Sequence, residues 1–184
     1  MSIKPDAGVI SELAKSYDII PIAKEIYADV ITPISLLRKM AQRYKRFFLL
    51  ESIEGGEKWG RYSFLGFNPL LRAVCKDGKV TIQSGESEYV ENGDPYDVLR
   101  KLMANYKAPK LCDMPPFAGG LVGYFAYSML GFEEPTLKLS GGEFNDYDLM
   151  LFDKVIAYDH LKQKIIIIVN MKTDKLLENY GKAV

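Results

Sequence analysis

The sequence predicts an α+β fold, a mostly antiparallel β-sheet or sandwich with a few packed helices. Three observations carry this prediction. Apolar, β-branched runs of strand length recur along the chain, and the longest aliphatic run is Ile165–Val169. Asp77-Gly78 separates two such runs in the way typical of a two-residue hairpin turn. Thr32-Pro33 and Asp94-Pro95 each place a capping side chain before a proline, which is typical of a helix start.

The first third of the chain is predicted to combine helices with strands. Pro21 forces its neighbour out of the helical region, so the apolar residues around it are extended. Apolar residues from Leu37 to Tyr44 recur at helical spacing behind Thr32. Gly55-Gly56 indicates a loop between two apolar strands. The predicted elements are a short helix over Ser11–Tyr17, an extended segment over Ile19–Ala23, a helix from Thr32, and strands over Phe47–Ser52 and Tyr62–Phe67.

The rest of the chain is predicted to contain two hairpins and two further helices. Val98, Leu99 and Leu102 share one face of the helix that begins at Asp94. Gly141-Gly142 lies in a polar stretch, which is therefore predicted to be an exposed loop. The elements are a hairpin of Arg72–Lys76 and Lys79–Gln83, a helix from Asp94, a strand over Gly119–Tyr127, a loop over Leu130–Phe144, a hairpin of Leu149–Tyr158 and Ile165–Asn170, and a helix from Thr173.

Composition narrows the classes of function. Lys plus Arg and Asp plus Glu are both 24, so the net charge is zero and gives no electrostatic reason to bind nucleic acid or an anionic membrane. No run reaches the ~20 apolar residues that a membrane helix needs. Cys75 and Cys112 form no motif and suit a reducing cytoplasm without a structural disulfide. We therefore expect a cytoplasmic protein, with residues 1–184 forming a single domain.

The strand over Phe47–Ser52 stops being apolar at Glu51, where burial should end. Because side chains alternate between the faces of a strand, Leu50 and Ser52 share one face and Glu51 points to the other. A half-buried carboxylate needs a partner such as an ammonium group. This strand end is therefore a candidate binding site.

The next strand mixes aromatic with cationic and hydroxyl side chains. Tyr62 is predicted on one face, with Arg61 and Ser63 on the other. Such a strand can serve an aromatic amino acid, whose ring needs an apolar slot and whose zwitterion needs donors and acceptors. The alternative interpretation is an ion pair between Glu51 and Arg61 across adjacent strands.

These segments resemble component I of anthranilate synthase. Leu49-Leu50-Glu51-Ser52 is similar to the family's Leu-Leu-Glu-Ser element, and Gly60–Gly66 is similar to its Gly-Arg-Tyr-Ser strand. The resemblance runs from about Tyr17 to about Tyr180 and includes Thr32-Pro33. It implies the N-terminal half of that chorismate-utilising fold, with a regulatory and structural role in the first committed step of tryptophan biosynthesis.

The resemblance also implies which residues bind L-tryptophan as feedback inhibitor. Ser52 matches the family's tryptophan-contacting serine, and Glu51 matches the adjacent acid. Leu50 shares the face of Ser52 and could contact the indole. The remaining candidates, where the family's second strand closes the site, are Arg61, Tyr62 and Ser63.

Catalysis is implied to lie elsewhere. In the family, a C-terminal chorismate-binding domain holds Mg²⁺ and converts chorismate and ammonia into anthranilate and pyruvate. The ammonia can come from glutamine through an amidotransferase subunit, component II. This sequence lacks that domain and also the family's Asn-Pro-x-Met-Phe segment of the tryptophan pocket, since no Met-Phe follows Asn68-Pro69. We expect no catalytic residue, metal ligand or cofactor in this chain and no activity from it alone; its expected partners are the C-terminal domain, component II and L-tryptophan.

Two other interpretations fit the same residues. Component I of aminodeoxychorismate synthase, in the folate pathway, shares the fold and much of the Gly-Arg-Tyr-Ser strand, although Glu51 favours the anthranilate branch. A stand-alone small-molecule sensor would use the same strands without an attached enzyme. Elsewhere, His160 is predicted to be a solvated residue of a hairpin turn, and Gly119, Gly120 and Gly123 are predicted to allow close backbone packing in a central strand.

Overall fold

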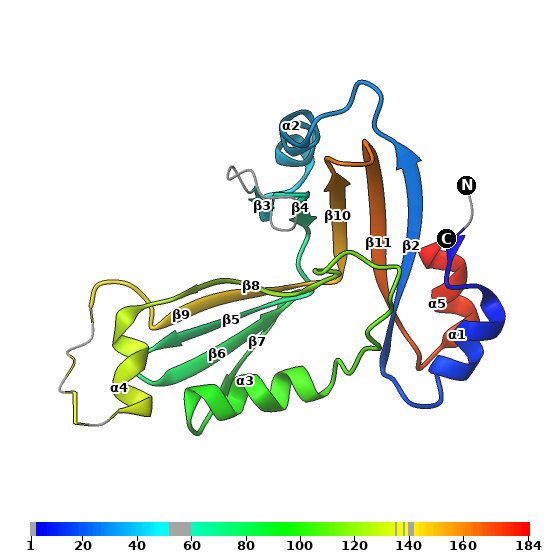
Figure 1. Cartoon of the computed structure of the whole chain (residues 1–184). Helices are drawn as coiled ribbons and strands as arrows, with labels where there is room; N and C mark the ends of the chain where they lie inside the picture. Colours follow the sequence, from blue (N-terminus) through cyan, green and yellow to red (C-terminus); the bar gives the residue numbers. More distant parts are fainter. Residues whose placement is uncertain (1–2, 52–59, 135, 138, 140–141) are drawn as a thin grey trace. The chain divides into compact units, whose positions relative to one another are not determined.

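The computed structural model describes residues 3–51, 60–134, 136–137, 139 and 142–184. Its contacts divide the chain into two compact units. Unit 1 contains Met1–Pro69, Tyr106–Gly120 and Phe152–Val184, and unit 2 contains Leu70–Asn105 and Leu121–Leu151. Within the described residues, each unit holds one antiparallel sheet together with helices (Figure 1), which confirms the predicted α+β class.

Unit 1 is built on a six-stranded sheet with the order β1-β2-β11-β10-β4-β3. Its strands are β1 (Ile3–Lys4), β2 (Ile19–Tyr27), β3 (Phe47–Leu50), β4 (Tyr62–Phe67), β10 (Lys154–Asp159) and β11 (Lys164–Lys172). Its helices are α1 (Ala7–Leu13), α2 (Pro33–Arg43) and α5 (Leu176–Ala183). Leu49 of β3 pairs with Leu65 of β4, and Ser63 of β4 pairs with Tyr158 of β10, so the polar ends of these three strands are neighbours.

Alternation along β2 and β11 gives this sheet two apolar faces. On one face, Ile20, Ile22 and Met171 pack with residues of α1 and α5, while Leu65 and Ile165 pack with residues of α2. On the opposite face, the packed residues are Ala23, Ala157, Ile166 and Ile168, and Met114 and Ala118 of the segment 106–120 cover them. Both faces are covered, as the continuous apolar runs predict.

Capping residues fix the helix starts in unit 1. Thr32 and Ser35 form a reciprocal capping box at the start of α2, with Ser35 N–H donating to Thr32 Oγ1 at 3.1 Å, so the predicted start is confirmed. The predicted helix over Ser11–Tyr17 is wrong in its bounds. Asp6 accepts a hydrogen bond from Val9 N–H at 3.0 Å and starts α1 earlier.

Unit 2 is built on a five-stranded sheet with the order β7-β6-β5-β9-β8 (Figure 1). Its strands are β5 (Leu71–Lys76), β6 (Lys79–Ser84), β7 (Ser87–Glu91), β8 (Gly120–Phe125) and β9 (Tyr147–Phe152). Its helical elements are α3 (Pro95–Ala104), the 3₁₀ turn η1 (Tyr127–Met129) and α4 (Leu130–Glu133). Positive φ angles of 49° at Asp77 and 75° at Gly78 confirm the predicted hairpin turn, and Asp94 caps α3 as predicted.

Three sequence predictions are wrong in detail. The strand over Leu149–Tyr158 is two strands, because β9 belongs to one sheet and β10 to the other, with Asp153 between them. The loop over Leu130–Phe144 begins with α4. The glycine-rich strand β8 lies at an edge of its sheet rather than in the centre. Close packing at Gly123 is nevertheless confirmed, because an added Cβ would overlap the backbone of Asp148.

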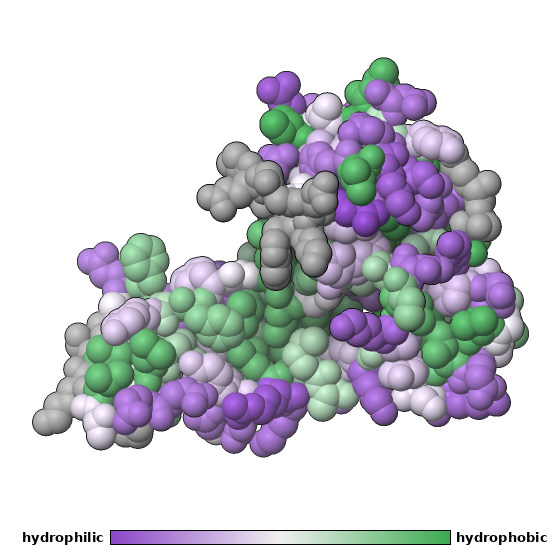
Figure 2. Space-filling model, viewed as in Figure 1, coloured by the Kyte–Doolittle hydropathy of each residue, from purple (hydrophilic) through white to green (hydrophobic). Residues whose placement is uncertain are grey.

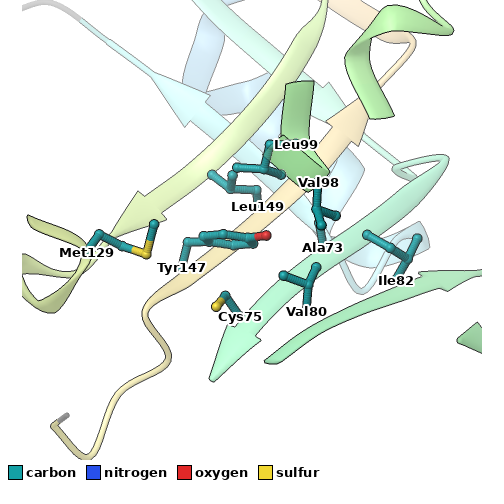
Figure 3. Packing of buried hydrophobic residues seen from close by; sticks show 9 residues of the cluster. All are labelled: Ala73, Cys75, Val80, Ile82, Val98, Leu99, Met129, Tyr147 and Leu149. Atoms are coloured by element: carbon teal, nitrogen blue, oxygen red, sulfur yellow. The ribbon is translucent and has the colours of Figure 1, made fainter. Parts of the chain in front are cut away.

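The core of unit 2 lies between its sheet and α3 (Figure 3). Val98 and Leu99 of α3 pack with Ala73, Cys75 and Tyr147 of the sheet, as the labelled side chains in Figure 3 show. Burial, with the Asp146 carboxylate nearby, raises the pKa of the Cys75 thiol to about 12. The thiol therefore stays protonated at ordinary pH.

This environment predicts selective labelling of the two cysteines. At pH 8, we expect iodoacetamide to label the folded chain once, on the exposed Cys112, because the nucleophilic thiolate of Cys75 is scarce and shielded. Mass spectrometry of the labelled peptides measures this. A second label should appear only after denaturation in urea, and labelling of Cys75 in the folded chain would contradict the burial described here.

Among the residues that the structure describes, no helix is long and apolar enough to cross a membrane. On the face viewed in Figure 2, hydrophilic and hydrophobic residues are interspersed.

Candidate functional site

The predicted site residues lie where β3 ends and β4 begins. Leu50 is the last residue of β3 and is 48% exposed, and the exposed Glu51 follows it. Ser52 lies outside the described residues. Tyr62 and Ser63 open β4, where Tyr62 is half-buried and Ser63 is completely buried.

Leu50 and Glu51 face opposite sides of the sheet, as alternation predicts. Leu50 pairs with Phe64 across the strands, whereas Glu51 Oε1 accepts a hydrogen bond from Ser63 Oγ at 3.5 Å. A single ligand can therefore contact both side chains only beyond the end of the strand.

Aromatic rings line the face that Leu50 shares. The Phe64 ring lies 5.8 Å from that of Tyr62 and 5.6 Å from that of Phe117, measured between centroids. Phe48 packs edge-on against Phe152 at 4.8 Å. Leu50 and the half-buried Tyr62 and Phe64 offer an apolar surface of the kind that holds an aromatic ring, whereas Phe152 is 2% exposed and lies beneath it.

Arg61 pairs with Asp159, so the predicted ion pair between Glu51 and Arg61 is wrong. Nε and Nη2 of Arg61 donate to the Asp159 carboxylate at 3.1 and 2.7 Å. Arg61 precedes the first residue of β4, and its guanidinium lies 4.8 Å from the centroid of the Tyr62 ring. The Arg61 side chain therefore lies on the same face of the sheet as Tyr62, whereas the sequence predicts it on the face of Ser63. Asp159 pairs with Tyr62 in the ladder, which explains the choice of partner.

Asp159 is 1% exposed and accepts further hydrogen bonds from the backbone N–H groups of Leu161 and Lys162, at 3.1 and 3.0 Å. Burial alone would raise its pKa, but the guanidinium and these N–H donors outweigh burial and hold the pKa below its usual value. Burial, followed by the charge of Asp159, raises the pKa of Tyr62. The site therefore contains the ionised carboxylate of Asp159 beside the neutral phenol of Tyr62.

His160 belongs to this region, and it lies in the predicted turn, but its prediction as a solvated side chain is wrong. The side chain is half-buried, and Nε2 lies 2.7 Å from Ser63 Oγ. The imidazole also packs on the Tyr158 ring with 4.8 Å between centroids. The sequence offers no signal for this contact, because it arises from the register between β4 and β10.

A groove elsewhere in unit 1 contains none of the predicted site residues. Its volume is about 780 Å³, and it is lined by residues of β1, β2 and β11, the start of α1, and the segment Leu111–Met114. Four of its charged side chains form two pairs, Lys164 with Glu25 at 2.8 Å and Lys4 with Asp113 at 3.5 Å, while the Asp6 carboxylate caps α1. The site at the end of β3 and β4 is thus distinct from this groove.

Comparison with known proteins gives consistent matches, although no family model matches the chain. Over 178 residues the chain is 40% identical to "Anthranilate synthase component 1" of Acetivibrio thermocellus. The aligned region covers 95% of this chain and 36% of that protein. Over 173 residues the chain is 35% identical to the protein of the same name from Aquifex aeolicus, covering 92% and 35% respectively. The chain therefore spans about a third of the length of these relatives.

A solved structure shows the same fold. The crystal structure of anthranilate synthase component I from Streptococcus pneumoniae matches with a TM-score of 0.54 and 23% sequence identity, over 86% of this chain and 34% of that one.

Proposed function

Because this chain is a homologue of anthranilate synthase component 1 and spans about a third of such proteins, we propose that it is their N-terminal regulatory and structural domain. In this proposal it forms one wall of a feedback site for L-tryptophan, while the rest of component I binds chorismate. The observation that carries the proposal is the homology over nearly the whole chain. Both relatives named above bear the anthranilate name, which favours this branch over the folate one.

The ends of β3 and β4 support a site for an aromatic amino acid. Leu50, Tyr62 and Phe64 offer an apolar surface for an indole ring. The Glu51 carboxylate, on the other face, can attract an ammonium group. An aromatic zwitterion needs both features, so a ligand at the strand end uses the two faces together.

Regulation would work through a shift in population. Tryptophan would bind one arrangement of this domain and the rest of component I more tightly than another, and so favour the less active arrangement. Within the described residues, no three His, Cys, Asp or Glu side chains gather as metal ligands. We place Mg²⁺, chorismate and the contacts that transfer ammonia from component II in the complete enzyme.

Titration with L-tryptophan tests this function. Adding L-tryptophan to the chain should shift the backbone amide signals of Leu50, Glu51 and Tyr62 in a saturable way, because these residues border the site. The shifts are followed in two-dimensional NMR spectra. Ser52→Ala should weaken them, whereas Ser87→Ala, on the exposed strand β7 of unit 2, should leave them unchanged.

The same titration on the complete component I subunit provides the decisive comparison. Shifts seen only there would show that the pocket needs its second wall. The absence of saturable shifts in both proteins up to millimolar tryptophan would contradict the proposed function. Binding that Ser52→Ala leaves unaffected would contradict the assignment of Ser52.

A further inference from the structure

Ser63 is polar and completely buried, and its hydroxyl lies at the centre of a chain of hydrogen bonds. Its Oγ lies 2.7 Å from His160 Nε2 and donates to Glu51 Oε1 at 3.5 Å. A buried hydroxyl without partners would be costly, and these two groups satisfy it. These hydrogen bonds therefore link the half-buried His160 to the exposed Glu51 through the buried Ser63.

The chemistry of the three groups gives this chain of hydrogen bonds a direction when Ser63 donates to Glu51. An ionised carboxylate only accepts hydrogen bonds, so the single Ser63 proton points to Glu51. Ser63 Oγ then accepts a hydrogen bond from His160 when the imidazole carries its proton on Nε2, whereas the tautomer with its proton on Nδ1 would itself take the Ser63 proton. We infer the first of these tautomers, in which the order of donation is His160 to Ser63 to Glu51.

Hydrogen bonds and ring packing hold His160 in a position from which it can orient Ser63 and Glu51. Its backbone N–H donates to Arg61 C=O at 2.8 Å, and its C=O accepts from Gln163 Nε2 at 2.8 Å. Its ring packs on the Tyr158 ring, whose hydroxyl contacts Gln163 Oε1 at 3.1 Å. The imidazole thus has a fixed place from which Nε2 reaches Ser63.

We propose that His160 is a positioning residue, which acts through the buried Ser63 hydroxyl to hold the Glu51 carboxylate in the orientation that receives the ammonium group of an amino-acid ligand. This inference rests on the proposed function and adds to it a residue that does not touch the ligand. With Oε1 held by Ser63, the ligand ammonium would approach Oε2. The remaining ligand contacts, with the indole and the carboxylate, do not depend on His160.

The first test is spectroscopic. His160 is the only histidine of the chain, so its imidazole signals in a long-range ¹H–¹⁵N spectrum need no assignment by mutation. We expect a proton on Nε2 and a shift of the imidazole signals in Glu51→Gln, because the acceptor at the end of the chain changes. A tautomer protonated only on Nδ1, or signals unmoved by Glu51→Gln, would overturn the inference.

The second test measures binding to the complete component I subunit with two ligands. L-Tryptophan carries the ammonium group, and indole-3-propionic acid lacks it. His160→Leu should weaken L-tryptophan binding by about three- to tenfold, the factor expected for one lost hydrogen bond. It should leave the affinity for indole-3-propionic acid unchanged. His160→Gln retains an amide donor at similar reach and should restore most of the tryptophan affinity.

Controls separate positioning from general damage. Leu161→Ala changes a 73% exposed residue of the same turn and should affect neither ligand. Equal weakening of both ligands by His160→Leu, or no rescue by His160→Gln, would overturn the inference, because a structural role predicts that result. Ser63→Ala offers a second break in the chain if His160→Leu fails to fold. Wild-type protein that does not bind tryptophan overturns the proposed function and this inference together, whereas wild-type affinity in His160→Leu overturns the inference alone.

Discussion

Asp159→Ala should be strongly destabilising, by about 2–3 kcal/mol in the free energy of unfolding. The substitution leaves the Arg61 guanidinium without its carboxylate and removes the acceptor of the Leu161 and Lys162 N–H groups. The Asp159 carboxylate is almost fully buried, whereas the Arg61 side chain is 28% exposed, so water can replace part of what the guanidinium loses and the cost stays below that of a fully buried ion pair. Urea unfolding followed by circular dichroism measures the difference.

A matched surface substitution provides the control. Glu178 pairs with Lys182 on α5, but both side chains are more than half exposed. Glu178→Ala should therefore change stability by less than about 0.5 kcal/mol. Similar effects from the two substitutions would contradict the role given to the buried Asp159.

The pH dependence of the Asp159 contribution has a definite sign. The folded-state pKa is lowered, so the contribution of this carboxylate is fully present above its unfolded pKa of about 3.9 and is lost as pH falls through the folded value. The stability difference between wild type and Asp159→Ala should be constant between about pH 5 and 8 and should shrink in stronger acid. A difference that grows on acidification would contradict this account.

The elements that could be predicted from sequence are those with local signals. The Thr32 and Asp94 caps and the Asp77-Gly78 turn involve residues within a few positions of each other, and the structure contains all three. Their side chains satisfy nearby backbone groups or permit a positive φ angle, so no distant contact is needed.

Pairings between distant strands could not be predicted in this way. Arg61 and Asp159 are 98 residues apart, and Ser63 and His160 are 97 apart. Both contacts follow from the register of β4 against β10, which alternation within one strand does not specify. The sequence therefore favours Glu51 as the partner of Arg61, whereas the structure pairs Arg61 with Asp159, which follows the apolar run of another strand. For the same reason, the sequence did not predict that the chain passes from one sheet to the other at Asp153, because apolar residues continue on both sides of it.

The arrangement of the two strand ends was predictable in outline. Alternation correctly placed Leu50 and Glu51 on opposite faces, because a strand of period two needs only local sequence to assign them. Ser52 stays a prediction, since it lies outside the described residues. His160 was missed because a turn histidine is usually solvated, and only the tertiary contact with Ser63 indicates otherwise.

Gly123→Ala should be the most damaging glycine substitution in unit 2, with a loss of about 3 kcal/mol in the free energy of unfolding. An added methyl group would overlap the Asp148 carbonyl oxygen and approach the Leu149 backbone. That backbone cannot move away easily, because Asp148 pairs with Val74 in the sheet and its carboxylate binds the Arg72 guanidinium through both Nε and Nη2. Urea unfolding, with hydrogen exchange of the β5 and β9 amides, measures the loss.

Gly142→Ala separates overlap from the general effect of replacing glycine. Gly142 also belongs to unit 2, but an added Cβ there meets no atom within 4 Å. Both substitutions reduce the conformational freedom of the unfolded chain, so a difference between them reports the folded state. We expect Gly142→Ala to change stability by less than about 0.5 kcal/mol, with exchange in β5 and β9 unaltered. If Gly123→Ala were equally mild, the strands β8 and β9 would have to lie further apart than the backbone contact at Asp148 requires.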